Sequence, residues 1–464
     1  MSAAQALASL DLVAQAEAIA EGAFTAEALT EAALAAAHAR ADLNAFVAIA
    51  GAPALEAARA VDLARARGQV LGPLAGVPLA HKDMFYRQGR VSGCGSKIRA
   101  GFVAGETCPL LARLDAAGAI DIGRLHMAEF AMGPTGHNAH LGRCRNPWAG
   151  AAITGGSSSG SGAAVGARIV AGALGSDTGG SVRLPAAICG VVGLKPTHGR
   201  LGQQGMMGLS ESMDTAGPLA RSARSVARLM TVIAGDGEDF AQGLRGDLAG
   251  LTIGLPVAYY ADGLAAEVAA AFAEAVRVLQ GLGARVIEVA MPDQAHLAAM
   301  AGLVWAPEAA ALHLDWLRDR PQDYGEQVRN RLLHGLAMPA ATYVRARRLR
   351  SADLAAMLAG PLARCDILAT PTLRMPTPGG EAAGANAGAA MDKVVGDLSA
   401  LTRPISYLGL PALSTPMGFD GAGLPLGLQL IGAPRAESLL LGAAHAFERA
   451  TDWLARPLPP LPST

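Results

Sequence analysis

The sequence predicts an α/β fold with a largely parallel or mixed sheet. Residues 106–122 have the pattern of a helix, a turn at Gly118 and a short strand, and residues 264–289 repeat this order with glycine at the helix C-terminus. A short apolar run at 77–80 lies between Gly and Pro residues and predicts a strand that delivers His81, Lys82 and Asp83 to its end.

The N-terminal part, residues 4–66, is rich in alanine and has apolar residues at helical spacing. Thr25 is the expected N-cap of one helix, with Glu27 in the first turn. The pattern predicts two or three helices that serve mainly as packing scaffold.

The later part of the chain divides into helical and irregular segments. Residues 300–360 are helical in pattern and carry Trp305, Trp316 and Tyr343, which suggests an elaboration on the core. Residues 373–392 are a Gly/Ala/Pro-rich loop, and the proline-rich tail cannot form regular structure because proline removes donors and fixes φ.

Composition excludes several classes of function. The 464 residues are 51% hydrophobic and 17% charged, with a net charge of −1, which gives no electrostatic footprint for nucleic acid. The five cysteines have no CxxC spacing, so neither a disulfide framework nor a thiolate zinc site is expected. The N-terminal segment carries Asp11 and Glu17 and lacks the basic start that a signal peptide has. No apolar run reaches the ~18–20 residues of a membrane helix. We expect a cytoplasmic protein with no membrane partner.

Nearly all the positively charged residues are arginine, and lysine is scarce. It occurs only at Lys82, Lys97, Lys195 and Lys393. A buried lysine can lose its proton and act as a base, whereas arginine cannot. All but Lys393 lie in Gly- or Pro-bounded segments near a glycine-rich stretch.

That stretch, residues 154–197, holds two Gly/Ser clusters at 155–162 and 175–181. Glycine is costly in regular structure, so this density indicates tight turns or backbone that approaches a ligand. A phosphate-binding loop would need a lysine after its glycines, and none lies between Gly155 and Gly180. The stretch also lacks the third glycine that a dinucleotide-binding fingerprint requires.

Three interpretations of the stretch remain. Residues 156–160 match the GxSxG nucleophile elbow with Ser158 at its centre, but the partner histidines available downstream lie in ordinary helical contexts (His296, His313, His334 and His445). A small-residue helix over 163–173 would leave Asp177 and Ser181 unexplained. The third interpretation pairs two serines with a neutral, buried lysine that activates the hydroxyl of one of them.

The segments GVPLAHKD, GGSSSGSGAAV, GSDTGGSVRLPAAICG and GLKPT support the third interpretation, because they resemble the amidase signature family of amidohydrolases. The family uses a Ser–cisSer–Lys triad, and the spacings of 75 positions from Lys82 to Ser157 and 24 from Ser157 to Ser181 match it. The resemblance extends from about residue 60 to the C-terminus. It implies a central, twisted, mixed β-sheet covered by helices on both faces.

The resemblance also implies roles for particular residues. Lys82 matches the general base, Ser157 the cis-serine that relays the proton, and Ser181 the nucleophile. Backbone N–H groups of Thr178, Gly179 and Gly180 would form the oxyanion hole. Asp177 and Arg183 would tie down this loop, and Phe130 and Met132 match the segment that lines the family's pocket.

The resemblance further implies one amidase domain over residues 1–464 that hydrolyses a small amide without a metal or organic cofactor. Residues 1–66 would be a helical scaffold, 67–220 the catalytic core, 300–360 a helical substrate-side elaboration and 361–464 the closing part. The expected partner is a small-molecule amide rather than nucleic acid. Homodimers are common in the family, so the resemblance also allows a homodimer.

The substrate remains open among amides, ureas and carbamates. Residues 306–350 are similar in pattern to the carboxybiuret-type hydrolases of the family, which act on urea-like amides. The rival function is the glutaminase subunit of a tRNA-dependent amidotransferase. That subunit carries an acid for the amino group of glutamine before its closing motif, whereas this chain has Arg403 directly before Pro404.

Overall fold

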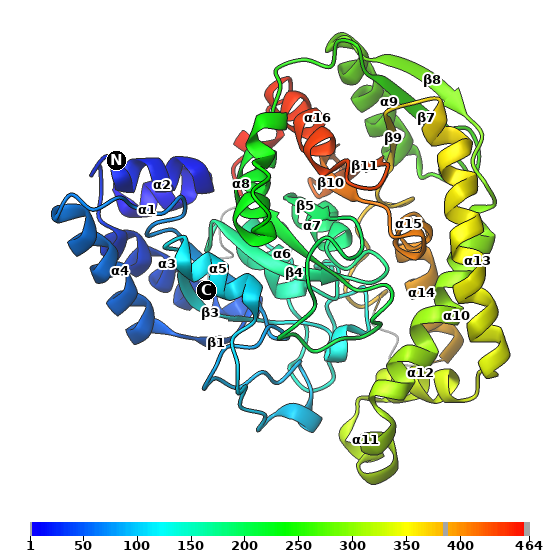
Figure 1. Ribbon diagram of the computed structural model, residues 1–464, viewed down its shortest axis with the longest axis horizontal. Helices are drawn as coiled ribbons and strands as arrows, with labels where there is room; N and C mark the ends of the chain where they lie inside the picture. The colour runs from blue at the N-terminus through cyan, green and yellow to red at the C-terminus, as the bar shows by residue number, and fades with distance from the viewer. Residues whose placement is uncertain (1, 384–387, 459–464) are drawn as a thin grey trace.

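The computed structural model describes residues 2–383 and 388–458 and is built around one mixed sheet (Figure 1). In this described part, eleven strands lie in the order β1-β3-β2-β4-β6-β5-β10-β11-β9-β7-β8. The pairs β2–β3, β2–β4, β7–β8 and β7–β9 are parallel, and the other neighbours are antiparallel. The strands are β1 (Phe46–Ile49), β2 (Pro78–Lys82), β3 (Ile120–Leu125), β4 (Gly172–Asp177), β5 (Val192–Lys195), β6 (Thr215–Ala220), β7 (Thr252–Pro256), β8 (Arg285–Val289), β9 (Ile367–Pro371), β10 (Ala412–Phe419) and β11 (Pro425–Gly432).

Helices surround this sheet and form a separate layer along one end of it, at the right of Figure 1. The α-helices of the described residues are α1 (Ala3–Ser9), α2 (Leu12–Ala20), α3 (Ala26–Ala39), α4 (Gly51–Ala66), α5 (Pro109–Ala116), α6 (Ser159–Gly166), α7 (Arg183–Cys189), α8 (Ala223–Ala234), α9 (Ala266–Gly281), α10 (Gln294–Leu312), α11 (Leu314–Asp319), α12 (Glu326–Leu336), α13 (Ala340–Ala359), α14 (Gly388–Ser399), α15 (Arg403–Leu408) and α16 (Glu437–Arg449).

The core lies on both faces of the sheet, as strand β4 shows. Successive side chains of a strand point to opposite faces. Ala173 packs in the cluster that contains α6, whereas Leu174 packs in the cluster that contains α8. The expected α/β fold, with a mixed sheet covered on both faces, is therefore confirmed.

Most elements expected from the sequence are present near their predicted places. The apolar run at 77–80 lies within β2, and residues 106–122 hold α5 and the start of β3, separated by Gly118 at φ 85°. Residues 264–289 hold α9 and β8. Thr25 caps α3 by accepting a hydrogen bond of 3.0 Å from the Ala28 N–H.

The N-terminal prediction missed a strand. Residues 4–66 contain the expected helices and also β1, which pairs antiparallel with β3 at the edge of the sheet. All four residues of β1 are half-buried. A run of four residues is too short to show the alternation that identifies a strand, so only its pairing with β3 reveals it.

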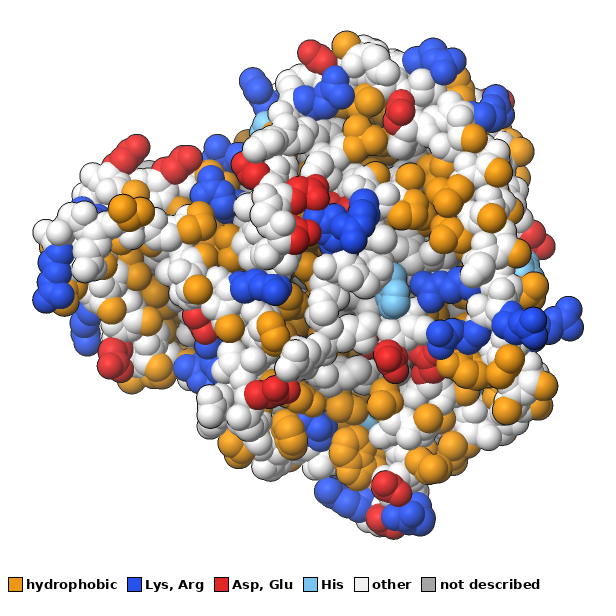
Figure 2. Space-filling view, in the orientation of Figure 1, with side chains coloured by type: hydrophobic (Ala, Val, Ile, Leu, Met, Phe, Trp, Pro, Cys, Tyr) orange, Lys and Arg blue, Asp and Glu red, His pale blue; other side chains and the backbone are white. Residues whose placement is uncertain are grey.

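The segment 300–360 is helical as predicted and supplies most of α10, with α11, α12 and α13. Helix α10 has the length and hydropathy of a membrane-spanning segment, but here it packs against α12, α13 and α15. The predicted loop at 373–392 runs into α14, and part of it, like most of the proline-rich tail, lies outside the described residues. On the face shown in Figure 2, acidic and basic side chains are interspersed, with apolar side chains between them.

Candidate active site

The carboxyl ends of β2 and β4 bring two separated parts of the sequence together. These strands are adjacent and parallel, so both end at the same edge of the sheet. Lys82 is the last residue of β2, and Asp177 is the last residue of β4. Ala80 packs with α6, and Lys82, two residues further along the strand, faces the same side.

The Lys82 amine contacts two serine hydroxyls. Its Nζ lies 2.7 Å from Ser157 Oγ and 2.8 Å from Ser176 Oγ, and the residue is 1% exposed. Burial lowers the pKa of Lys82 to about 7, although the carboxylates of Asp214 and Asp177 favour the charged form. Lys82 can therefore be a neutral amine near neutral pH, which a general base must be.

We expect kcat/KM to rise with pH through about 7 and to be flat above it. Below the pKa of about 7, Lys82 is an ammonium ion and cannot accept a proton, so the rate falls about tenfold per pH unit. The measurement is kcat/KM for an uncharged amide from about pH 5.5 to about pH 10.5, which spans the ordinary lysine pKa. A profile that is flat over this range, or one that rises only near the ordinary lysine pKa, would contradict this role.

Ser157 follows a cis peptide bond. The bond between Gly156 and Ser157 is cis, as the resemblance implies for this serine. Ser157 is fully buried, and its carbonyl accepts a hydrogen bond of 3.1 Å from the Ala128 N–H. A Cβ on Gly156 would lie 2.4 Å from the Gly133 carbonyl oxygen, so this close approach of two backbone segments requires glycine.

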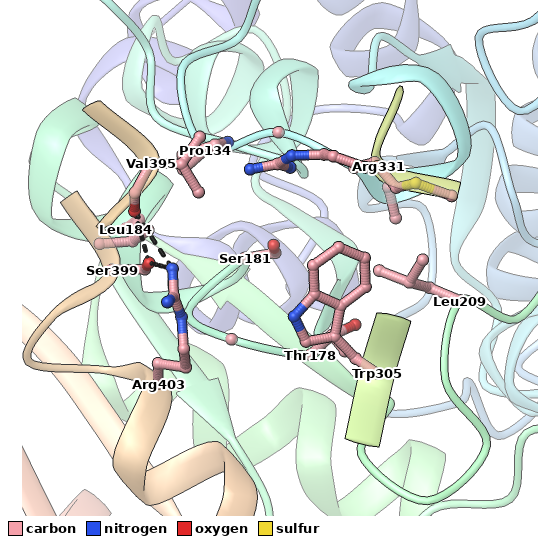
Figure 3. A pocket seen from close by; sticks show the side chains of 14 residues that line it. Pro134, Thr178, Ser181, Leu184, Leu209, Trp305, Arg331, Val395, Ser399 and Arg403 are labelled. Carbon is pink, nitrogen blue, oxygen red and sulfur yellow. Dashed lines mark hydrogen bonds between the residues drawn. The ribbon is translucent and has the colours of Figure 1, made fainter. Parts of the chain in front are cut away.

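Ser181 opens into a small cavity of about 70 Å³ that Thr178 and Gly179 also line (Figure 3). Two larger cavities, of about 390 and 220 Å³, share Met132 and Arg331 respectively with its wall. The expected triad residues are thus gathered at one edge of the sheet, with Ser181 facing the space where a substrate can bind.

One of the expected oxyanion-hole amides is already engaged. The Gly180 N–H donates a hydrogen bond of 2.7 Å to Asp177 Oδ1, so it does not point into the cavity as expected. Within the described chain, the Gly179 and Ser181 N–H groups donate to no acceptor. The sequence could not distinguish these amides, because the choice depends on the φ of 132° at Gly180.

Asp177 and Arg183 form a fully buried ion pair that holds the loop before Ser181. Arg183 donates through Nε and Nη2 to the two Asp177 carboxylate oxygens at 3.0 and 2.9 Å, and also to Gln429 and Ser406 at 2.7 Å each. Burial raises the pKa of Asp177, but Arg183 outweighs it and holds this pKa at about 2. The supporting role expected for both residues agrees with these contacts.

We expect Arg183→Met to lower the free energy of unfolding by roughly 3–5 kcal/mol, because it leaves a buried carboxylate uncompensated. The Asp177 pKa should also rise. The stability that Asp177 contributes above pH 3.8 in the natural chain should then be absent, and the variant should instead become less stable as pH rises through the raised Asp177 pKa. Urea unfolding at several pH values measures both effects.

Arg348→Met provides the control for this experiment, because Arg348 is exposed on α13. It should change the unfolding free energy by less than about 0.5 kcal/mol. A loss for Arg183→Met no larger than that of the control would show that the buried pair does not hold the loop.

Two polar residues of the site were not anticipated. Ser176 is the second partner of Lys82, and Asp214 accepts hydrogen bonds of 2.5 Å from the Thr178 hydroxyl and 2.6 Å from the Leu209 N–H. Burial raises the pKa of Asp214. Ser176 lies inside the glycine-rich stretch and could have been found there, but Asp214 reaches the site only through the pairing of β6 with β4.

The two expected substrate contacts have different environments. Met132 lines the cavity, as predicted. Phe130 does not: its ring packs in an aromatic cluster with centroid distances of 4.3 Å to His313 and 5.9 Å to Trp316 and Tyr324. The backbone turns between the two residues, with Phe130 at φ 46°, so their side chains diverge.

Metal-ligating side chains do not cluster in the part of the chain that the structure describes. No group of three or more His, Cys, Asp or Glu residues there is arranged to hold a metal ion. The cysteines are free and buried. The polar groups described for the candidate site are hydroxyls, backbone amides, the Lys82 amine, the Asp177 and Asp214 carboxylates and guanidinium groups.

Comparison with known proteins gives consistent matches over nearly the whole chain. Residues 28–441 match the family model described as Amidase. The glutamyl-tRNA(Gln) amidotransferase A-subunit of Chromohalobacter salexigens is 40% identical over 454 residues, which cover 90% of this chain and 91% of that protein. Its counterpart from Thiobacillus denitrificans is 37% identical over 449 residues, covering 89% and 91%.

Solved structures share the fold. A chain described as "Crystal structure of amidase" superposes with a TM-score of 0.87 at 34% identity, covering 95% of this chain and 99% of that one. Another, described by the words "An unexpected vestigial protein complex reveals the evolutionary origins of an s-triazine catabolic enzyme", gives a TM-score of 0.88 at 36% identity, covering 95% and 98%.

Proposed function

The chain belongs to the amidase signature family, and from this premise we propose that it hydrolyses the C–N bond of a small amide, urea or carbamate through an acyl-enzyme on Ser181. The observation that carries the proposal is the buried contact of 2.7 Å between Lys82 Nζ and Ser157 Oγ, beside the cavity that Ser181 lines.

The proposed mechanism is acyl transfer in two steps. Neutral Lys82 takes the Ser181 proton through Ser157, and Ser181 Oγ attacks the carbonyl carbon. Free backbone N–H groups of the loop at Gly179 and Ser181 stabilise the oxyanion. The C–N bond breaks and the amine leaves with a proton returned through Ser157. Water then attacks the acyl-enzyme by the same relay and releases the acid.

An amine-release assay tests the proposal. The panel comprises glutamine, aliphatic and aryl amides, biuret-like ureas and carbamates, with Ser181→Ala as the blank. We expect release from at least one class above the blank. If no compound in the panel is hydrolysed faster than by Ser181→Ala, the proposed function fails.

The second candidate is a glutaminase subunit of a tRNA-dependent amidotransferase. The curated relatives described above carry that name, which favours it. Against it, no acid immediately precedes Pro404, where this chain has Arg403, and this arginine lines the Ser181 cavity. Glutaminase activity that appears only when partner subunits are added would favour this alternative.

A urea-like substrate is our preferred class among the open ones. Residues 306–350 resemble the carboxybiuret-type hydrolases, and the solved chain linked by its description to an s-triazine catabolic enzyme is 36% identical to this one. Faster release from biuret-like ureas than from simple aliphatic amides in the same panel would support this choice.

A further inference from the structure

Two arginines face Ser181 across its cavity. Arg331 lies on α12, and Arg403 is the first residue of α15. Both line the cavity, and Figure 3 shows the Arg331 guanidinium above Ser181 and the Arg403 guanidinium to one side of it, directed toward Ser399 and Val395. Each arginine is partly buried.

Neither arginine is neutralised by the protein. Within the described residues, neither forms a salt bridge. Arg331 donates no hydrogen bond there and lies over the Trp305 ring, with 5.8 Å between its Cζ and the ring centroid. Arg403 donates only through Nη2, to the Val395 carbonyl oxygen at 3.3 Å and to Ser399 Oγ.

Acidic side chains are missing from the described wall of this cavity, where the residues are apolar, glycine, hydroxyl-bearing or arginine. The Asp392 carboxylate favours the charged form of Arg331, but Asp392 is exposed and forms an ion pair with neither arginine. Burial and the charge of Arg403 lower the pKa of Arg331 to about 10, so both groups are still charged at neutral pH. Charges removed from water are normally paired.

We propose that Arg331 and Arg403 together form an anion site, and that the substrate is a small amide or urea that carries a carboxylate on the same molecule. This inference rests on the proposed function and names its substrate class. A guanidinium matches a carboxylate with two parallel hydrogen bonds, and its fixed charge persists across the working pH range.

The position of the arginines sets where such a substrate carries its carboxylate. Ser181 and both arginines line the same cavity, so a carboxylate held by the arginines lies close to the carbonyl carbon that Ser181 attacks. A substrate ammonium group would face two positive charges and no acid. The same cavity therefore disfavours amides of free amino acids.

The first test measures binding without catalysis. Succinate and its uncharged diamide, succinamide, are titrated calorimetrically into the Ser181→Ala protein at fixed ionic strength. We expect succinate to bind at least about tenfold more tightly than succinamide, and Arg331→Gln or Arg403→Gln to weaken succinate binding by about 10–100-fold. The exposed Arg348→Gln should leave it unchanged.

The second test compares kcat/KM for succinamate and succinamide. We expect a preference of about 100-fold for the carboxylate in the natural chain, expressed mainly in KM, and its collapse toward one in Arg331→Gln. A structural role for Arg331 is separated by thermal unfolding. In the protein without ligand, Arg331→Gln removes no hydrogen bond and relieves the repulsion between two like charges. The melting temperature of the variant should therefore be unchanged or higher.

The outcomes distinguish the two proposals. Equal binding of succinate and succinamide, or unchanged succinate binding in both arginine variants, overturns the anion site. If Ser181-dependent release is then found with uncharged amides, the proposed function survives. Arginine-dependent succinate binding without release from any amide would retain the anion site and reject the hydrolase.

Discussion

Ser181→Ala is expected to lower kcat for the preferred amide by at least about 10⁴-fold while the protein remains folded. The hydroxyl is the group that forms the acyl bond. The other hydroxyls of the described cavity wall, on Thr178 and Ser399, donate to Asp214 and to the Val395 carbonyl oxygen and do not contact Lys82. The free loop amides and both arginines are retained, so succinate affinity should change little. Steady-state amine release measures the first effect, and calorimetry measures the second.

Ser158→Ala is the matched control, because the GxSxG pattern would make Ser158 the nucleophile. In the structure, Ser158 Oγ is fully buried and bonds the Ser176 backbone, with 3.2 Å to its N and 3.2 Å to its O. It should therefore keep measurable turnover. Loss of all activity in Ser158→Ala together with full activity in Ser181→Ala would reverse the assignment.

Local spacing was enough to predict the parts of the site that lie on consecutive residues. The strand that carries Lys82 and the loop that carries Ser181 follow from glycine, proline and apolar runs only a few residues long. The contact between Lys82 and Ser157 was not derivable from these runs. The resemblance implied this contact, and the structure shows how it arises: β2 pairs with β4, which brings Lys82 beside Ser176, and α6, which follows Ser157, packs on both strands.

The substrate side of the site could not be predicted for a different reason. Arg331 and Trp305 lie in helices whose sequence pattern indicates packing, and only the placement of α10 and α12 at the end of the sheet turns them toward Ser181. Arg403 was noticed only as the absence of an acid. Only the position of Arg331 in the structure shows that Arg403 is one of two positive charges that line the same cavity.

Lys82→Arg is expected to lower kcat about 10³–10⁴-fold at pH 8, nearly as severely as loss of the nucleophile. Arginine keeps a positive charge at this position but cannot release its proton, so no base is left to receive the Ser181 proton through Ser157. The residual rate should also lose its rise near pH 7, because that rise is the titration of the Lys82 amine.

Lys195→Arg separates loss of the base from the strain of inserting a guanidinium into a buried site. Lys195 is also fully buried, and burial lowers its pKa to about 7, but its Nζ donates to the Pro196 carbonyl oxygen at 2.9 Å rather than to a serine of the site. Thermal unfolding of both variants shows which of them is folded. A folded Lys195→Arg protein should keep the rise in rate near pH 7. Near-normal kcat in Lys82→Arg at pH 8 would remove Lys82 from the mechanism, because an arginine at this position cannot become the neutral base that the relay requires.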